Sequence, residues 1–330
     1  MFTEAIESIL RDLCTPAAIR AVERGGSPAV LWQAIEQGGF LELMTPEEQG
    51  GAGLDLAALF PILAAFGRHA LPVPAGQSIA ARALLAARGL VAPDGMLTMS
   101  GCASRVNGGA VSAPCVPFGM LADYALVNLD GKALLLDCAK ASRVATGVPG
   151  SLSAGLYWRA EAAQGPVTAD GEAVRHFSAA MHAAAIAGAM ESLLARTLEY
   201  CNDRAQFGKP IARFQAVQHQ LSVMAEQVAA AGMAAGQAFA GAGRTPAPLP
   251  VALAKSRTSM AAPLVAATAH ALHGAIGITE EFDLQLYTRR LHEWRMAEGA
   301  EGYWNGVLGR AVLAQDGATA LDFVRTALAA

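Results

Sequence analysis

The residues best suited to chemistry stand where a long apolar helical stretch is interrupted, in the segment CNDRAQFGKPIARFQAVQHQL. A cation, an amide, an aromatic ring and a flexible backbone position meet there at one predicted helix boundary, from Arg204, Gln206, Phe207 and Gly208. The cluster indicates a binding site rather than a connector. The alternative interpretation is a surface arginine and a core phenylalanine that stand beside a helix break and bind nothing. Asp203 is the expected local charge partner of the arginine.

A second segment with binding character, GAIGITEE, begins at Gly274 after another predicted helix. Its two glycines, Gly274 and Gly277, permit a close backbone approach. Thr279, followed by two glutamates, predicts a capped helix start. A tight turn between two helices would need the same glycines, so both interpretations are open at this point.

Further along, the segment MAEGAEG carries two carboxylates one helical turn apart, Glu298 and Glu301. A carboxylate in an apolar pocket has a raised pKa and can act as a general base. A surface carboxylate near a helix start is the alternative for each. His270 and His273 have a spacing that could mimic a metal pair. No carboxylate or thiol completes such a site nearby, so we expect helix-packing histidines and no metal.

The bulk composition excludes several classes of protein. Of the 330 residues, 53% are hydrophobic and 16% are charged, and the formal net charge is −4, so no basic field for nucleic acid exists. So much apolar surface must be buried in a core or against other subunits. The most apolar runs are rich in alanine and broken by arginines, and we expect no membrane span. The five cysteines lack CxxC spacing, which predicts free thiols in a reducing, cytoplasmic setting.

The elements that must position these residues change in character twice along the chain. Residues 1–92 read as a helical domain. Residues 93–175 are short, turn-bounded segments rich in valine, threonine and serine, with a hairpin signal at Asp130-Gly131, and predict a small β domain. Residues 176–330 are helical again. They contain an apolar seam suited to antiparallel helix packing, at Phe214, Val217, Leu221, Met224 and Val228. The predicted fold class is mainly α with a small β domain.

This order of elements, with two long segments, resembles the flavin-dependent acyl-CoA dehydrogenases. The two segments are YCNDRAQFGKPIARFQAVQHQLSVMAE and HALHGAIGITEEFDLQLYTRRLHEWRMAEGAEGYW. The resemblance covers nearly the whole chain, because LWQAIEQGGFLELMTPEEQGGAGL is similar to the family's N-terminal helices and VPFGMLADYALV to its central β domain. It implies an N-terminal helical domain, a central β-barrel-like domain and a C-terminal four-helix bundle.

The resemblance implies FAD as cofactor and an acyl-CoA as substrate. In the family, the arginine and phenylalanine matching Arg204 and Phe207 reach across a subunit interface to the partner's FAD, and Gln206 stands between them. The loop of Gly274 and Gly277 would lie against the adenosine end of the cofactor. The residue types agree with this assignment, because a pyrophosphate needs a fixed cation and a flavin ring needs an apolar wall.

Glu298-Gly299 falls where the family carries its catalytic Glu-Gly. The resemblance therefore implies Glu298 as the base for the α-proton, with Glu301 as its rival, while FAD accepts the hydride. The backbone N–H of Glu298 and a ribityl hydroxyl would hold the thioester oxygen. The expected product is a 2,3-enoyl-CoA, and an electron-transferring flavoprotein would reoxidise the flavin. Some members carry the base on the helix that opens the C-terminal bundle, but FSAAMHAAAIAGA has no acidic residue there.

The sequence departs from the family pattern in three places. Ala271 stands where a glutamine is usual, and FSAAMHAAAIAGA lacks the arginine that many members have beside the substrate. The central domain lacks both the Thr-Glu-Pro-x-x-Gly-Ser-Asp-like segment and the Trp-Ile-Thr strand that touches the flavin. A chain trimmed there would bind its own flavin poorly. The alternative expectation is a non-catalytic or half-site subunit that completes the FAD site of a heteromeric acyl-CoA dehydrogenase. Either way we expect a homo- or hetero-oligomer, a tetramer built as a dimer of dimers, in fatty acid metabolism and lipid degradation.

Overall fold

The computed structural model describes residues 2–165, 167–315 and 319–328. Their packing divides the chain into two compact units. Unit 1 contains Met1–Ile62, Leu71–Met181 and Ala242–Ala247. Unit 2 contains Leu63–Ala70, His182–Gly241 and Pro248–Ala330.

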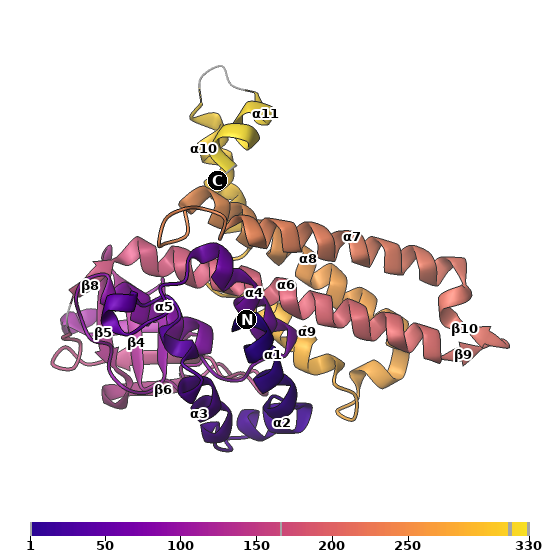
Figure 1. The fold of residues 1–330 in the computed structure, drawn as a ribbon, viewed down its shortest axis with the longest axis horizontal. Helices are drawn as coiled ribbons and strands as arrows, with labels where there is room; N and C mark the ends of the chain where they lie inside the picture. The colour runs from indigo at the N-terminus through magenta and orange to yellow at the C-terminus, as the bar shows by residue number, and fades with distance from the viewer. Residues whose placement is uncertain (1, 166, 316–318, 329–330) are drawn as a thin grey trace. The chain divides into compact units, whose positions relative to one another are not determined.

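Helices form most of the described chain (Figure 1). The α-helices are α1 Phe2–Leu13, α2 Pro16–Glu23, α3 Ala29–Gln37, α4 Leu56–Arg68, α5 Ala75–Ala86, α6 Gly171–Asp203, α7 Gln215–Gln237, α8 Pro248–His273, α9 Leu284–Met296, α10 Glu301–Leu313 and α11 Ala320–Phe323. The short 3-10 helices that bear on the sites below are η1 Phe40–Glu42, η2 Glu47–Gln49, η5 Ile211–Arg213 and η6 Gly274–Ile278.

The strands of unit 1 form two four-stranded sheets, ordered β1-β4-β5-β8 and β2-β3-β7-β6. Their bounds are β1 Leu97–Ser100, β2 Ser104–Arg105, β3 Val111–Val116, β4 Tyr124–Leu129, β5 Lys132–Asp137, β6 Ala141–Ala145, β7 Ala154–Trp158 and β8 Val167–Asp170. Residues of both sheets share one apolar core, which includes Val127 and Leu136 from the first sheet and Val111 and Trp158 from the second. The sheets therefore pack on each other through alternate, inward-facing residues.

The predicted hairpin at Asp130-Gly131 is confirmed. β4 and β5 pair antiparallel with Leu129 opposite Lys132, so that two residues form the turn. Asp130 and Gly131 have φ values of +53° and +77°. Two consecutive residues with positive φ match the right-handed twist of the flanking strands, which is why an Asp-Gly pair favours this turn.

Unit 2 is built on long helices that approach one another closely. A Cβ added at Gly188 of α6 would lie 1.9 Å from the carbonyl oxygen of Ala64, and one added at Gly67 would lie 2.0 Å from that of Ala185. Side chains larger than hydrogen are therefore excluded at both crossing positions. This packing accounts for much of the alanine and glycine content of these helices.

α8 lies at the centre of the remaining helices of unit 2. It packs along α7, and it also contacts α9 and α10 (Figure 1). The predicted seam on α7 holds, because Leu221, Met224 and Val228 are buried. The mainly α fold class with a small β region is confirmed. The division into three domains, with boundaries after residues 92 and 175, stays a prediction.

Two helical stretches are long and apolar enough, by length and composition alone, to cross a membrane: Gly171–Asp203 and Pro248–Ile278. The fold buries 78% of the most apolar window of the first stretch but only 39% of that of the second. Core helices of soluble proteins pass the same test. The expected absence of a membrane span stays a prediction.

Candidate functional site

The predicted break after α6 is a small hairpin. α6 ends at Asp203, and strands β9 (Ala205–Gln206) and β10 (Lys209–Pro210) pair antiparallel beyond it. Phe207 and Gly208 form the two-residue turn, with φ values of +50° and +79°. A positive φ is ordinary for glycine but uncommon for a bulky side chain. Phe207 therefore keeps a strained conformation at the tip of the hairpin.

The Phe207 ring is 91% exposed, so it is not a core phenylalanine. Its ring lies edge-on to that of Phe214, with 6.2 Å between the centroids. The ammonium of Lys209 lies over the Phe214 ring, 4.4 Å from its centroid. A strained and exposed aromatic ring is the kind of residue that an interface or a ligand covers.

Arg204 stands at the base of the hairpin with its side chain exposed. Its backbone is fixed on both sides, because its N–H donates to the Tyr200 carbonyl at 2.8 Å and its carbonyl accepts from the Ile211 N–H at 2.8 Å. Within the described chain its guanidinium has neither a hydrogen bond nor an ion pair. The predicted pairing with Asp203 is wrong. Both side chains point into solvent at the end of the helix, and the cation is left available for a ligand.

A cavity of about 490 Å³ lies beside the hairpin, entirely within unit 2. It joins the two predicted binding segments, because the residues around it come from the hairpin and from the glycine loop. They are Tyr200, Arg204, Gln206, Ile211, Ala271, Leu272, His273, Gly274, Ala275 and Ile276. The structure thus brings together three of the five predicted cofactor-binding residues. Phe207 and Gly277 lie outside the lining.

The glycine loop is the 3-10 helix η6. Gly274 has a φ of +64° and open space where a side chain would stand, so its backbone faces the cavity freely. Gly277 is buried, and a Cβ there would lie 2.9 Å from the Cβ of His273. Gly274 therefore suits a ligand's approach and Gly277 suits tight packing.

The predicted helix start capped by Thr279 is wrong. Thr279 follows the last turn of η6, and its hydroxyl donates back to the Ile276 carbonyl at 2.8 Å. The next helix, α9, begins five residues later at Leu284 without a side-chain cap. The hydroxyl closes the preceding turn and does not cap a following helix. Threonine side chains can hydrogen-bond to backbone groups on either side along the chain, so the two arrangements compete.

Two residues of the cavity lining, Tyr200 and His273, carry aromatic rings. The rings of Tyr200 and His273 are stacked with centroids 4.4 Å apart, and Phe282 lies 4.9 Å from His273. His273 Nδ1 contacts the Ala269 carbonyl at 2.7 Å, while in the described structure its buried Nε2 has no hydrogen-bond partner. Burial lowers the pKa of His273 below its ordinary value, which favours a neutral ring.

The two histidines pack between helices, as predicted. His270 Nε2 meets the Thr288 hydroxyl at 3.0 Å, which joins α8 to α9. Burial lowers the pKa of His270 as well. Among the described residues no group of three histidines, cysteines or carboxylates is arranged to hold a metal ion.

Glu298 lies in the short connection between α9 and α10, outside the cavity just described. Only 7% of this residue is exposed. Its φ is +56° and that of Gly299 is +99°, so the chain turns through two consecutive left-handed residues. The Trp304 indole N–H donates to the Gly299 carbonyl at 3.1 Å. The carboxylate is thus buried on a tightly turned segment.

Glu301 is poorly placed to compete as a base. Its carboxylate accepts two hydrogen bonds from Arg295, one of them from Nε at 2.9 Å. The Arg295 guanidinium lowers the pKa of the Glu301 carboxyl below its ordinary value. A carboxylate already neutralised by a bidentate partner is a weak base.

Sequence reasoning missed one residue beside this segment, Lys255. It is the sole lysine of α8 and is fully buried, and it donates hydrogen bonds to the carbonyls of Arg295 and Gly299. A single lysine in an alanine-rich, mostly apolar helix was the available signal. Its partners lie 40 and 44 residues further along the chain, so no local spacing pointed to them.

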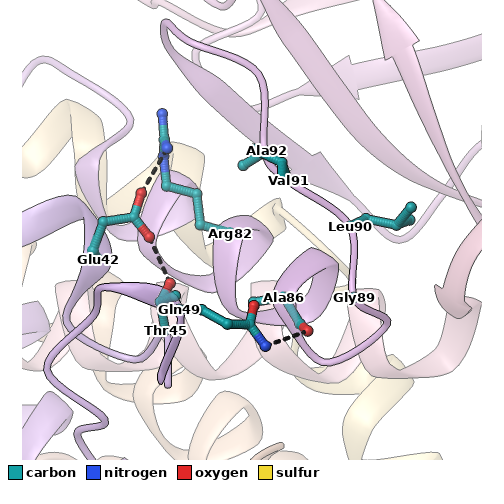
Figure 2. Close-up of a pocket in the computed structure, with 9 residues that line it drawn as sticks. All are labelled: Glu42, Thr45, Gln49, Arg82, Ala86, Gly89, Leu90, Val91 and Ala92. Carbon is teal, nitrogen blue, oxygen red and sulfur yellow. Dashed lines mark hydrogen bonds and ion pairs between the residues drawn. The ribbon is translucent and has the colours of Figure 1, made fainter. Parts of the chain in front are cut away.

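A second cavity, of about 400 Å³, lies in unit 1 and contains none of the predicted residues (Figure 2). Arg82 of α5 pairs with Glu42 of η1 at 2.7 Å, and Glu42 also accepts from the Thr45 hydroxyl at 2.6 Å. Gln49 donates to the Ala86 carbonyl at 3.4 Å on the same wall. These polar groups bind one another, so the cluster cross-links η1 to α5.

The central sheets make polar contacts within the chain after β1 and after β3. After β1, the Gly101 carbonyl accepts from Arg175 Nε at 3.3 Å and Nη2 at 3.0 Å. After β3 comes Pro117, whose carbonyl accepts from the buried Thr98 hydroxyl. Proline has no backbone N–H to offer to a ligand.

The residues around the larger cavity fit part of an FAD molecule. An unpaired arginine, an amide and an open glycine backbone suit a pyrophosphate and the groups next to it. The flavin ring needs contacts that this lining does not include, and both expected flavin-contacting motifs are absent from the sequence of the central domain. The cavity lining therefore fits the pyrophosphate part of the cofactor.

Two family models match the chain. The acyl-CoA dehydrogenase N-terminal domain matches residues 1–90, and the acyl-CoA dehydrogenase C-terminal domain matches residues 174–313. The acyl-CoA dehydrogenase IpdE2 of Mycobacterium tuberculosis is 34% identical over 297 residues, which span 88% of this chain and 90% of that protein.

Solved structures of two-chain assemblies share the fold. The crystal structure of the ChsE4-ChsE5 complex from Mycobacterium tuberculosis matches with a TM-score of 0.84 and 22% identity, over 96% of this chain and 97% of that chain. The Tcur3481-Tcur3483 steroid ACAD matches with a TM-score of 0.80 and 25% identity, over 94% of this chain and 96% of that chain.

Proposed function

This chain belongs to the acyl-CoA dehydrogenase family, and from that premise we propose that Glu298 is the base with which it oxidises an acyl-CoA to a 2,3-enoyl-CoA. Membership confirms the predicted family, the oxidoreductase class and FAD as the family's cofactor. The observation that supports the assignment of Glu298 is its burial on a segment of two left-handed residues, while Glu301 is neutralised by Arg295.

FAD, when bound, supplies the acceptor for the hydride that leaves the β-carbon. The Glu298 carboxylate takes the proton from the α-carbon, and the pair of electrons left behind forms the new double bond. A carboxylate within reach of the α-proton can act as the general base for this step. The backbone N–H of Glu298 is the chain's donor to the thioester oxygen, where negative charge develops.

Arg204 and Phe207 serve the cofactor rather than the substrate. We place the pyrophosphate of FAD on Arg204, with Gln206 and the backbone of Gly274 beside it, while Gly277 packs the loop behind. Phe207 stands outside the cavity on the exposed tip of the hairpin. An exposed ring on a strained backbone gains contacts when subunits assemble. The FAD that Phe207 contacts therefore belongs to a neighbouring subunit in this proposal.

A second candidate is a half-site subunit that completes the FAD site of a longer partner chain. The reduced central sheets favour it, because the missing motifs would weaken the flavin side of this chain's own site. Likeness to two-chain assemblies gives it further support. Flavin content separates the two candidates: one FAD per chain for a self-sufficient enzyme, and one per pair of chains for the half-site subunit.

Assembly, compartment and electron acceptor belong to the same proposal. α8 presents Met260 and Leu264 to solvent one turn apart, and α7 presents Met233. Such an apolar surface suits a dimer of dimers, with copies of this chain or with a partner chain. The cysteines of the described chain are free thiols, which fits a reducing cytoplasm. An electron-transferring flavoprotein takes the electrons onward, in the degradation of a fatty acid or another lipid acyl chain.

The assignment of the base is tested with Glu298→Gln and the matched variant Glu301→Gln. Gln keeps the shape and removes the base, so we expect flavin reduction by acyl-CoA to slow by roughly 10²–10⁴ in Glu298→Gln. Glu301→Gln should lose only its ion pair with Arg295. Anaerobic stopped-flow absorbance of the flavin is the measurement. Wild-type reduction by Glu298→Gln, or a larger loss in Glu301→Gln, would remove Glu298 from the role.

A further inference from the structure

Lys255 is fully buried in α8, yet all three of its N–H donors have partners. Its Nζ lies 2.7 Å from the Arg295 carbonyl, 3.0 Å from the Gly299 carbonyl and 3.0 Å from the Ser259 hydroxyl. Lysine is almost never fully buried unless it is paired. An ammonium group has three donors and no acceptor, so this set of partners suits the protonated form.

The two carbonyls that Lys255 binds stand on either side of Glu298. Arg295 belongs to the last turn of α9, and Gly299 follows the glutamate directly. A non-glycine residue in the left-handed region persists only where its surroundings hold it there. Lys255 holds the segment at both ends, and Trp304 provides a second donor to the Gly299 carbonyl.

The electrostatic surroundings bring the titration of Lys255 close to neutral pH. Burial lowers the pKa of Lys255 to about 7, the nearby charges of Glu298 and Glu301 oppose that shift, and Arg295 adds to it. The carbonyl of Arg295 is one of those left without a helical partner at the end of α9, where a cation is favoured. The Lys255 ammonium therefore binds two carbonyls, that of Arg295 at the C-terminal end of α9 and that of Gly299 directly after Glu298.

We propose that Lys255 is the positioning residue for Glu298: its ammonium fixes the backbone of residues 295–299 and so keeps the carboxylate in the conformation that removes the α-proton. The inference rests on the proposed function, because it takes Glu298 as the base. Lys255 itself touches neither substrate nor cofactor in this account.

The test replaces Lys255 by Met in the assembled, flavin-loaded protein, with Arg257→Met as the matched control. Arg257 is a cation on the same helix whose partner is the Gln227 amide oxygen at 2.8 Å, away from the segment. We expect Lys255→Met to lower kcat for flavin reduction by roughly 10–100-fold with little change in KM, since small misplacements of catalytic groups cost up to about 10²-fold. Amide hydrogen exchange over residues 297–303 should become faster, and the control should leave both readouts unchanged.

Lys255→Gln keeps two donors and cannot titrate, and it provides a second readout if the Met variant folds poorly. We expect its kcat to lie between those of the wild type and the Met variant. The protonated ammonium is the form of Lys255 that binds the two carbonyls. Wild-type kcat should therefore contain a component that declines as the pH rises through about 7. The Gln variant should lack this component. If Lys255 served only the stability of the fold, replacing it by Gln would leave this pH-dependent component of kcat in place.

Two results would overturn the inference: wild-type kcat and pH profile in Lys255→Gln, or hydrogen exchange unchanged in Lys255→Met. Glu298→Gln, run alongside, separates this failure from that of the proposed function. If Glu298→Gln loses flavin reduction while the Lys255 variants keep it, only the positioning role fails. If Glu298→Gln keeps wild-type reduction, the assignment of the base fails and the positioning role fails with it, whatever hydrogen exchange shows.

Discussion

At the scale of single residues, this chain keeps two charged groups whose surroundings differ sharply. Arg204 is exposed and unpaired within the described chain, beside a cavity that also reaches Gly274. Lys255 is buried, with every donor used inside the protein. An exposed cation loses little stability when it is removed, whereas a buried hydrogen-bonded one leaves unsatisfied partners behind. The first is suited to a ligand and the second to holding the fold.

This contrast predicts the outcome of Arg204→Ala. Flavin affinity should fall by roughly 10-fold or more, because a charge-assisted contact with the pyrophosphate is lost. The unfolding midpoint without flavin should stay close to that of the wild type. Arg213→Ala is the matched control, since Arg213 is an exposed neighbour outside the cavity lining. A collapse of stability without flavin, with flavin affinity retained, would make Arg204 structural.

At the scale of elements, the hairpin of β9 and β10 presents Phe207 at a positive φ. The ring is mostly in solvent, so its contribution to the stability of the isolated fold is small. The strain of its backbone is a cost that contacts beyond the edge-on contact with Phe214 would have to offset. The hairpin therefore presents Phe207 for contact with another molecule and does not pack it into the core.

Phe207→Gly should therefore separate stability from assembly. The variant relieves the strain, and we expect the free energy of unfolding without flavin to hold or rise by up to about 1 kcal/mol. Flavin retention and oligomer stability should both decline because the ring is gone. Gly208→Ala is the control that adds strain without removing a contact, as nothing lies within 4 Å of its added Cβ. A marked loss of stability in Phe207→Gly would show instead that the ring supports the fold.

The sequence predicted those elements whose signals are local. The Asp130-Gly131 turn and the break at Arg204 depend on residues next to one another, and both were found where expected. The start of α9 was misplaced because the Thr279 hydroxyl can bond either way along the chain, and packing chose the preceding turn. Lys255 escaped notice because its partners become neighbours only when α8, α9 and α10 pack together. Local spacing carries no information of that kind.

At the scale of the whole molecule, the chain combines a complete helical part with reduced central sheets. Its family models match the N-terminal and C-terminal parts, over residues 1–90 and 174–313. The central part carries an intact apolar core but lacks the expected flavin-contacting motifs. We therefore propose that assembly completes its cofactor site, with the apolar residues exposed on α7 and α8 as the surface for it.

The proposed dehydrogenation is tested by following flavin and product in one anaerobic experiment. The protein, assembled alone or with a longer partner chain, is mixed with straight, branched and steroid-side-chain acyl-CoA thioesters. We predict that one of them bleaches the flavin absorbance and yields one 2,3-enoyl-CoA for each flavin reduced. Bound flavin that stays oxidised with every thioester, in both assemblies, would contradict the account.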